Sequence, residues 1–143
     1  MLYLRITGRD PVLNKRYLVS ALLGTLFCLV FFLVYDRFSH GVRSPYMTFL
    51  FLWPLVLELI PAAVLLFFPR IPAPAALTAV VWHSGTAALT AGSALRGVFD
   101  IAGNASEYQR SLMIFGFFML ALSLLSLIIS IFLYYIFNNH GNN

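Results

Sequence analysis

The chain has 143 residues, of which 61% are hydrophobic and only 10% are charged, and its formal net charge is +4. Soluble domains contain about half apolar and about a quarter charged residues, so this composition excludes an ordinary soluble domain. The charged residues lie at the ends of apolar segments and form no basic face, which excludes nucleic acid as a partner.

Four apolar segments fill most of the chain. A helix that spans a bilayer needs about 20 apolar residues, so four spanning helices leave no room for a second domain. We therefore predict one all-α integral membrane domain over residues 1–143, folded as an antiparallel bundle of four transmembrane helices with the lipid bilayer around it.

The first apolar segment predicts a helix over about 11–35. Asp10 is a suitable N-cap, and Pro11 suits the first helical position. Lys15 and Arg16 precede the apolar part as they would in a signal peptide. The apolar part is longer than a signal sequence requires, and no small-residue cleavage site follows it. We predict a retained membrane anchor.

The second segment predicts a helix over about 46–68, again opened by a serine and a proline, Ser44 and Pro45. Two further prolines, Pro54 and Pro61, each remove a backbone hydrogen bond from the preceding turn. Glu58 lies between them on the same helical face, close to the middle of the membrane.

The third segment predicts a helix over about 75–101, ending before Gly103. The proline-rich connection 69–74 is short and stiff, so this helix should return antiparallel to the second. One side of the helix carries a polar stripe of four residues: His83, Thr86, Thr90 and Ser93. A neighbouring side is small and predicts close helix packing: Ser84, Ala88 and Gly92.

The fourth segment predicts a helix over about 107–137, opened by a capping box in which Asn104 pairs with Glu107 or Ser106 pairs with Gln109. It is longer than a bilayer requires, so it should tilt or protrude. Basic residues before the first helix favour a cytoplasmic N-terminus, and four helices then place both termini in the cytoplasm. We predict residence in the plasma membrane.

Glu58 and His83 are the two ionisable side chains within predicted helices that most need an explanation. They lie at similar distances from the turn between their helices, so they should meet side by side. One interpretation is a proton-sensitive site or a binding site for a polar ligand. The other is structural: Glu58 bonds a carbonyl freed by Pro61, and His83 bonds a hydroxyl.

Arg96 closes the polar stripe at its outer end. It could pair with Asp100 four residues later, or attract an anionic headgroup or substrate. The candidate substrate or proton site therefore comprises six residues: Glu58, His83, Thr86, Thr90, Ser93 and Arg96. The hydroxyl groups of the stripe are also typical of structural hydrogen bonds between membrane helices.

The chain carries no motif for a metal, a nucleotide or a nucleophilic enzyme, and we expect no cofactor and no catalytic residues. The single cysteine, Cys28, cannot form an intrachain disulfide. We expect a non-enzymatic subunit of a larger membrane assembly or a homo-oligomer that docks through the small face. The alternative is a small proton- or solute-coupled transporter or channel-like protein, and a third interpretation is a lipid-modifying or quinone-linked enzyme.

Overall fold

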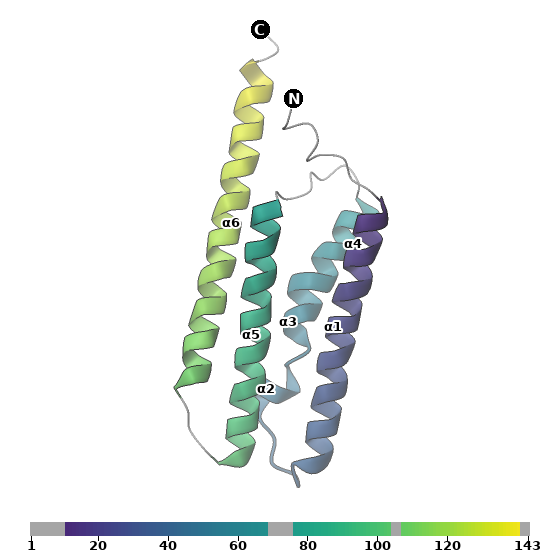
Figure 1. Ribbon diagram of the computed structural model, residues 1–143, viewed down its shortest axis with the longest axis vertical. Coiled ribbons are helices and arrows are strands. Elements are labelled where there is room, and N and C mark those ends of the chain that lie inside the picture. The colour runs from purple at the N-terminus through teal and green to yellow at the C-terminus, as the bar shows by residue number, and fades with distance from the viewer. Residues whose placement is uncertain (1–10, 69–75, 104–106, 141–143) are drawn as a thin grey trace.

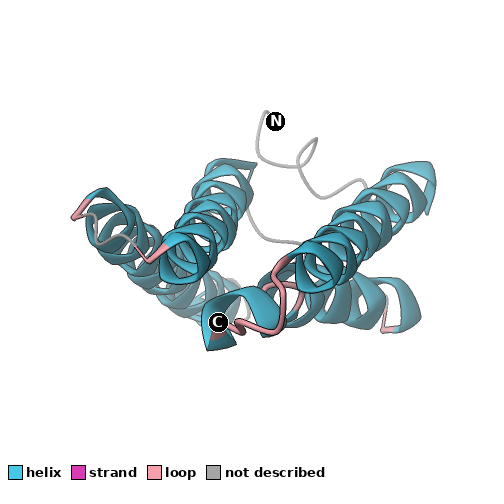
Figure 2. Cartoon of the chain, turned by 90° about the horizontal axis from the view of Figure 1, so that it is seen from below, coloured by secondary structure: helices cyan, strands magenta, loops and turns pink. Residues whose placement is uncertain are grey.

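The computed structural model describes residues 11–68, 76–103 and 107–140, and these residues form helices with no strand. The elements are α1 (Pro11–Phe38), α2 (Pro45–Thr48), α3 (Leu52–Pro54), the π-helix η2 (Leu55–Leu59), α4 (Ile60–Phe67), α5 (Ala76–Ala102) and α6 (Tyr108–His140). The long helices lie roughly along one axis, with the start of α1 and the end of α6 at the same end of the molecule (Figures 1 and 2).

Three of the four predicted helices match the structure to within about three residues, the usual uncertainty of helix ends. Gly103 follows the last residue of α5 with φ of +69°, a left-handed conformation that glycine adopts without a steric penalty. The predicted cap at Asp10, the connection 69–74 and the predicted caps at 104–106 lie outside the described residues.

The second predicted helix is wrong as one continuous helix. It begins at Pro45 as expected, breaks after Thr48 and widens into the π-helical turn η2 between Pro54 and Pro61. Proline has no N–H, so neither proline can donate to the carbonyl four residues before it. Between the two prolines the helix is wider: the Ile60 N–H donates to the Leu55 carbonyl, five residues earlier.

Helices α5 and α6 form a tightly packed antiparallel hairpin. A Cβ atom added to Gly85 would lie 3.0 Å from the Gly116 carbonyl oxygen, and one added to Gly116 would lie 2.8 Å from Leu89 Cγ. The buried hydroxyl of Ser123 donates to the Thr78 carbonyl, and the Thr78 and Ser126 hydroxyls are 2.8 Å apart. Small residues and interhelical hydroxyl bonds therefore hold this pair together.

We call residues 45–67, from α2 to α4, the broken segment. Helix α1 packs against one flank of the broken segment, on α3, η2 and α4. Helix α5 contacts the opposite flank of that segment, mainly through α2 and α3. Cys28 of α1 forms a small buried core with Met47 and Leu50, in and just after α2. The broken segment therefore separates α1 from the α5–α6 hairpin over much of its length.

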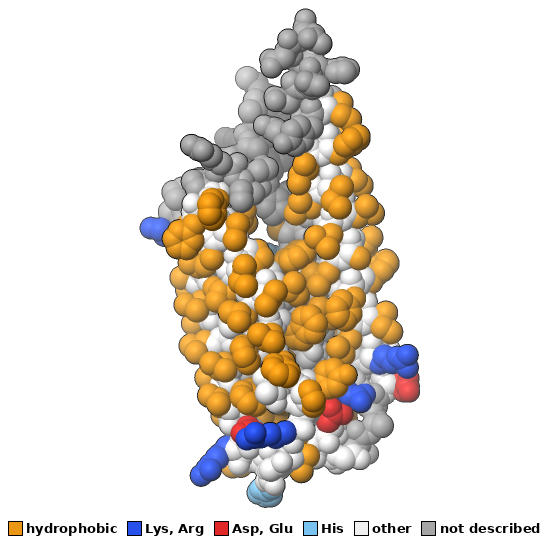
Figure 3. Space-filling model, turned by 180° about the vertical axis from the view of Figure 1, so that it is seen from behind, with side chains coloured by type: hydrophobic (Ala, Val, Ile, Leu, Met, Phe, Trp, Pro, Cys, Tyr) orange, Lys and Arg blue, Asp and Glu red, His pale blue; other side chains and the backbone are white. Residues whose placement is uncertain are grey.

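Two helical segments are long and apolar enough to cross a membrane, Lys15–Phe38 and Tyr108–Leu133, and Leu52–Phe67 is a shorter apolar segment. Only 17% and 11% of the apolar windows of the two long segments are buried, so they do not resemble core helices of a soluble protein. On the face shown in Figure 3, hydrophobic side chains cover most of the surface, and most of the visible charged side chains gather at the lower end. This supports a membrane protein at the level of composition and length.

Candidate functional site

Glu58 is the centre of a polar cluster that joins three parts of the chain. It lies in the π-helical turn η2, and its Oε2 atom accepts a hydrogen bond from the Tyr17 hydroxyl of α1 at 2.7 Å. The same oxygen lies 2.7 Å from His83 Nδ1 of α5. The sequence-based prediction that Glu58 and His83 lie side by side is therefore confirmed in geometry. Tyr17 was missed, because its place near a helix end suggested only an interfacial aromatic residue.

Trp82 donates a hydrogen bond to the backbone carbonyl that Pro61 leaves without a partner. In an α-helix the Leu57 carbonyl would accept from the N–H of residue 61, which proline lacks. The Trp82 indole Nε1 donates to the Leu57 carbonyl at 2.6 Å. In this arrangement an indole, and not the Glu58 carboxyl, satisfies the freed carbonyl, so the carboxyl is available to Tyr17 and His83.

The His83 imidazole is held on one side and open on the other. With Glu58 as a carboxylate, which can only accept, Nδ1 carries the proton, and in the neutral imidazole Nε2 then presents a lone pair. Among the side chains that the structure describes (residues 15–68, 76–103, 107–133 and 136), none makes a hydrogen bond to Nε2. The His83 side chain is 42% exposed, whereas that of Glu58 is 12% exposed. The Tyr17 ring packs edge-on against the imidazole, with centroids 5.1 Å apart.

An open groove of about 610 Å³ runs along the inner sides of α1 and α5, with the broken segment as its floor. We call it the α1–α5 groove. Its walls carry small side chains from both helices: Ser20, Ala21 and Gly24 from α1, and Ala87, Ala91 and Ala94 from α5. Tyr17, Glu58 and His83 line one end of it, and the remainder is almost entirely apolar.

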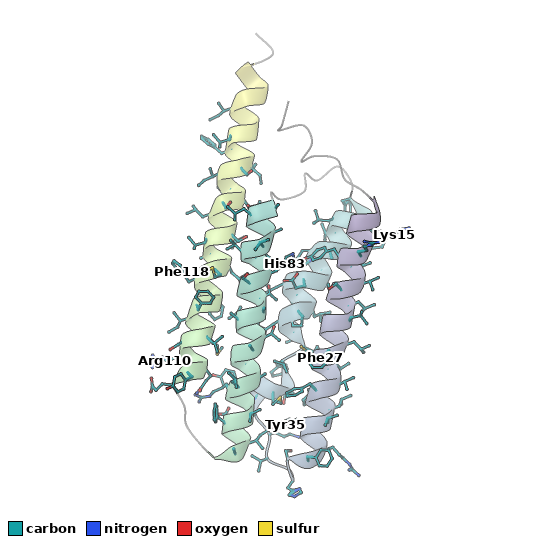
Figure 4. All side chains as sticks on the ribbon, in the orientation of Figure 1. Lys15, Phe27, Tyr35, His83, Arg110 and Phe118 are labelled. Atoms are coloured by element: carbon teal, nitrogen blue, oxygen red, sulfur yellow. The ribbon has the colours of Figure 1, made fainter. Side chains whose placement is uncertain are left out.

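The polar cluster lies near one end of the bundle, not at its middle. Tyr17 is only two residues after Lys15, at the beginning of the apolar segment of α1. His83 lies on α5 between the levels of Lys15 and Phe27 (Figure 4). The expectation that Glu58 lies close to mid-membrane stays a prediction, since these positions describe the bundle alone. Its helix is broken and shortened by the two prolines, and its partner Tyr17 is close to the end of α1.

The hydroxyl stripe of α5 divides between two sides of the molecule. Thr86 and Thr90 line the α1–α5 groove, but their hydroxyls donate to the carbonyls four residues earlier in α5. Ser93 lies away from the groove, where its hydroxyl accepts a 2.7 Å hydrogen bond from the Trp53 indole of α3. The structure therefore brings together four of the six predicted site residues, including Glu58 and His83.

Arg96 belongs to a separate cluster at the opposite end. Its Nε lies 3.0 Å from Asp100 Oδ1, as the spacing of four residues predicts. The Ser44 hydroxyl donates to Asp100 Oδ2 at 2.8 Å, which ties the start of α2 to α5. At about 1.5 Å per residue, Arg96 is about 20 Å from His83 along α5, so the two side chains do not share a site.

The predicted small face of α5 is used within the chain. Ala88 and Gly92 are buried, and a Cβ atom on Gly92 would lie 2.8 Å from Met113 Cγ of α6. Ser84 is exposed, and its hydroxyl donates to the Val80 carbonyl of its own helix. Gly85, one residue further on, takes the place in the packing that was predicted for Ser84.

Within the described ranges, no group of three or more His, Cys, Asp or Glu side chains could hold a metal ion. Comparison with protein-family models, with curated proteins and with solved structures gave no match. The interpretation of the site therefore depends on its geometry and chemistry.

Proposed function

We propose that the chain is a multipass integral membrane protein of the plasma membrane, with four membrane-embedded segments and both termini in the cytoplasm. The exposed apolar surfaces of α1 and α6 support this, since such surface is stable in lipid and not in water. The intervening α5 carries the hydroxyls and most of the glycines of the close contacts, which suits an inner helix of a membrane bundle.

We propose that the α1–α5 groove binds an amphiphilic small molecule, with a hydrogen-bond donor of the ligand on His83 Nε2 and its apolar part along the groove. The observation that carries this proposal is the state of His83. Glu58 fixes its Nδ1, while Nε2 has no partner among the described side chains, and His83 lines the groove. A carboxylate behind an imidazole orients the ring and raises its basicity toward a group on its other side.

The groove itself selects for an apolar ligand body. Almost all of its lining beyond the cluster is apolar, and the hydroxyls of Thr86 and Thr90 are already bonded within α5. A polar group placed deep in the groove would lose its water without a replacement partner, which is costly. A ligand with one polar end and one apolar end fits both parts of the site.

The hydrogen bond can be observed at the atom that would make it. Protein with ¹⁵N-labelled histidine in lipid bilayers would be examined by solid-state NMR, with the His83 signals assigned by their loss in His83→Gln. We expect 1-dodecanol to shift the Nε2 resonance, because its hydroxyl can donate. Dodecyl methyl ether, which has the same apolar chain and cannot donate, should leave that resonance unchanged.

Two variants of neighbouring residues separate the groove from general effects of the alcohol on the membrane. Gly24→Phe should remove the shift, because a Cβ atom on Gly24 meets nothing within 4 Å and the ring would fill the groove. Leu23→Phe is the matched control, since Leu23 is 59% exposed and does not line the groove. An equal shift with the ether, or an unchanged shift in Gly24→Phe, would overturn the proposal.

A second candidate is docking of a helix from another subunit or from a second copy in the same groove. It is favoured by the small residues on both walls, which permit close approach of a helix. Gly24→Phe would then abolish association in bilayers, measured by crosslinking or by single-molecule photobleaching. Unaltered association would count against this candidate and leave ligand binding as the use of the groove.

Proton- or solute-coupled transport would be a further step, because it also requires the site to open toward the other side of the membrane. The titratable pair Glu58 and His83 on facing helices is the feature that supports it. Glu58→Gln should then abolish flux into proteoliposomes, and unchanged flux in that variant would exclude transport through this site.

A further inference from the structure

A second groove, of about 380 Å³, lies on the other side of the broken segment. We call it the α2–α3 groove. It shares no lining residue with the α1–α5 groove. Its wall is formed by large apolar and aromatic side chains at successive turns of the broken segment: Tyr46, Phe49, Leu52, Trp53 and Val56. Ser93 of α5 lies at its floor, with its hydroxyl bonded to Trp53.

One end of the α2–α3 groove is marked by Arg96. Its guanidinium carbon lies 5.4 Å from the centre of the Tyr46 ring, a cation–π contact with the first aromatic residue of the groove wall. The next wall residues follow about one turn apart, Phe49, then Leu52 and Trp53, then Val56, and lead away from Arg96. Arg96 is not itself a lining residue, but its contact with Tyr46 places a cation beside this end of the apolar groove.

The Arg96 guanidinium is paired with a carboxylate but makes no hydrogen bond to it. Its Nε lies 3.0 Å from Asp100 Oδ1 without a hydrogen bond, and its two terminal nitrogens have no acceptor in the described part of the chain. The Asp100 carboxylate is itself held by the Ser44 hydroxyl, so the ion pair keeps the guanidinium near the start of α2. The Arg96 side chain is 42% exposed, which leaves these terminal donors accessible to an anion. Paired terminal N–H groups match the oxygens of a phosphate.

The depth of Arg96 agrees with that of a lipid headgroup. It lies six residues before the end of α5 and pairs with Asp100, which is bonded to Ser44 in the loop before α2. Charged side chains gather at the lower end of the face shown in Figure 3. A phosphate joined to an apolar chain is the defining chemistry of a phospholipid, and the adjoining groove accepts the apolar chain. We propose that the α2–α3 groove is a phospholipid site, with the phosphate on Arg96 and one acyl chain along Tyr46, Leu52 and Val56.

This inference rests on the membrane location proposed above and is independent of the ligand of the α1–α5 groove. It can be tested by native mass spectrometry of the full chain released from vesicles of equimolar phosphatidylglycerol and phosphatidylcholine. We expect one retained phospholipid per chain. Arg96→Gln should lower the retained fraction by roughly fivefold, the size expected for one arginine contact with an anionic headgroup.

Arg43→Gln is the control for the charge, because Arg43 pairs with Asp36, whereas Arg96 contacts the lining residue Tyr46. A second pair of variants tests the acyl-chain part and does not depend on Arg96. Val56 and Ile60 are both 49% exposed on the broken segment, but only Val56 lines the groove. Val56→Trp should lower retention, whereas Ile60→Trp should not.

The two pairs of variants give distinct outcomes. Equal loss of lipid in Arg43→Gln, or full retention in Arg96→Gln, would overturn the headgroup contact. Full retention in Val56→Trp would overturn the acyl-chain site. If Arg96→Gln fails to fold, as judged by its circular dichroism, the Val56 and Ile60 variants decide the proposal. A negative result for the phospholipid site does not change the NMR test of His83, so the two proposals can be overturned independently.

Discussion

The two sides of α5 carry similar small residues and behave in opposite ways. On the side of α6, Gly85 and Gly92 allow side-chain and backbone atoms of that helix to approach closely, and the interface is closed. On the side of α1, Ala87 and Ala91 line an open groove. Small side chains therefore permit close helix packing in this protein, but they do not by themselves produce it.

The difference lies in what faces the small residues. Across the closed side, a large residue fills the space beside each glycine: Leu120 beside Gly85, and Leu89 beside Gly116. Across the open side, Ala87 and Ala91 share the groove with Ala21 and Gly24, which are also small, so neither wall supplies the missing volume. The broken segment and the Tyr17–Glu58 hydrogen bond then hold α1 at this distance.

Gly116→Leu should give the largest effect, because it fills the closed side. Its Cβ atom would lie 2.8 Å from Leu89 Cγ and 3.0 Å from the Gly85 carbonyl oxygen, and a backbone atom cannot rotate away. We expect the free energy of unfolding to fall by about 3 kcal/mol, the upper range for overpacking. Denaturant unfolding in micelles, followed by circular dichroism, measures this. Gly24→Leu, on the open side, is the control and should cost little; equal losses would contradict the comparison.

Glu58→Ala should destabilise next, because it removes the bridge that fixes the end of the open side. The Tyr17 hydroxyl and His83 Nδ1 would both lose their acceptor. We expect a loss of about 2 kcal/mol in the free energy of unfolding, within the range for hydrogen bonds to a charged group. Glu58→Gln retains an acceptor oxygen and should lose less. If both variants unfold like the parent chain, the cluster does not stabilise the position of α1.

Trp82→Phe should cost about 1 kcal/mol, because the Leu57 carbonyl loses its only indole donor. A double-mutant cycle with Pro61→Ala sharpens this prediction. Alanine at position 61 restores a backbone N–H that can donate to the same carbonyl, so Trp82→Phe should cost less in that background. Equal costs in both backgrounds would show that the indole does not replace the hydrogen bond lost at Pro61.

Gly24→Ala should change the free energy of unfolding least, and it should raise it where the other variants lower it. A Cβ atom at this position meets nothing within 4 Å, so only helix propensity changes. We expect a gain of about 0.5–1 kcal/mol in the free energy of unfolding. Gly85→Ala, measured alongside, should be destabilising because of the 3.0 Å approach to Gly116. Destabilisation by Gly24→Ala would mean that the α1–α5 groove is occupied by protein.

Three of the four helices and the contact between Glu58 and His83 could be predicted from the sequence. Proline and glycine signals gave the start at Pro45 and the end before Gly103, since these depend on local backbone geometry. Equal distances from a tight turn predicted that Glu58 and His83 would meet, which the structure confirms at 2.7 Å. Position along a helix follows directly from residue number, so this part of the prediction needed no tertiary information.

Only the tertiary structure decided which faces meet. The break after Thr48 rotates and shifts the remainder of the broken segment, so the partners of Trp53 and Trp82 could not be read from helical periodicity. Tyr17 joined Glu58 because α1 packs against η2, a choice that depends on volumes contributed by several helices. A helix by itself sets the depth and the face of each side chain, whereas packing of the whole chain determines which face is covered and which stays open.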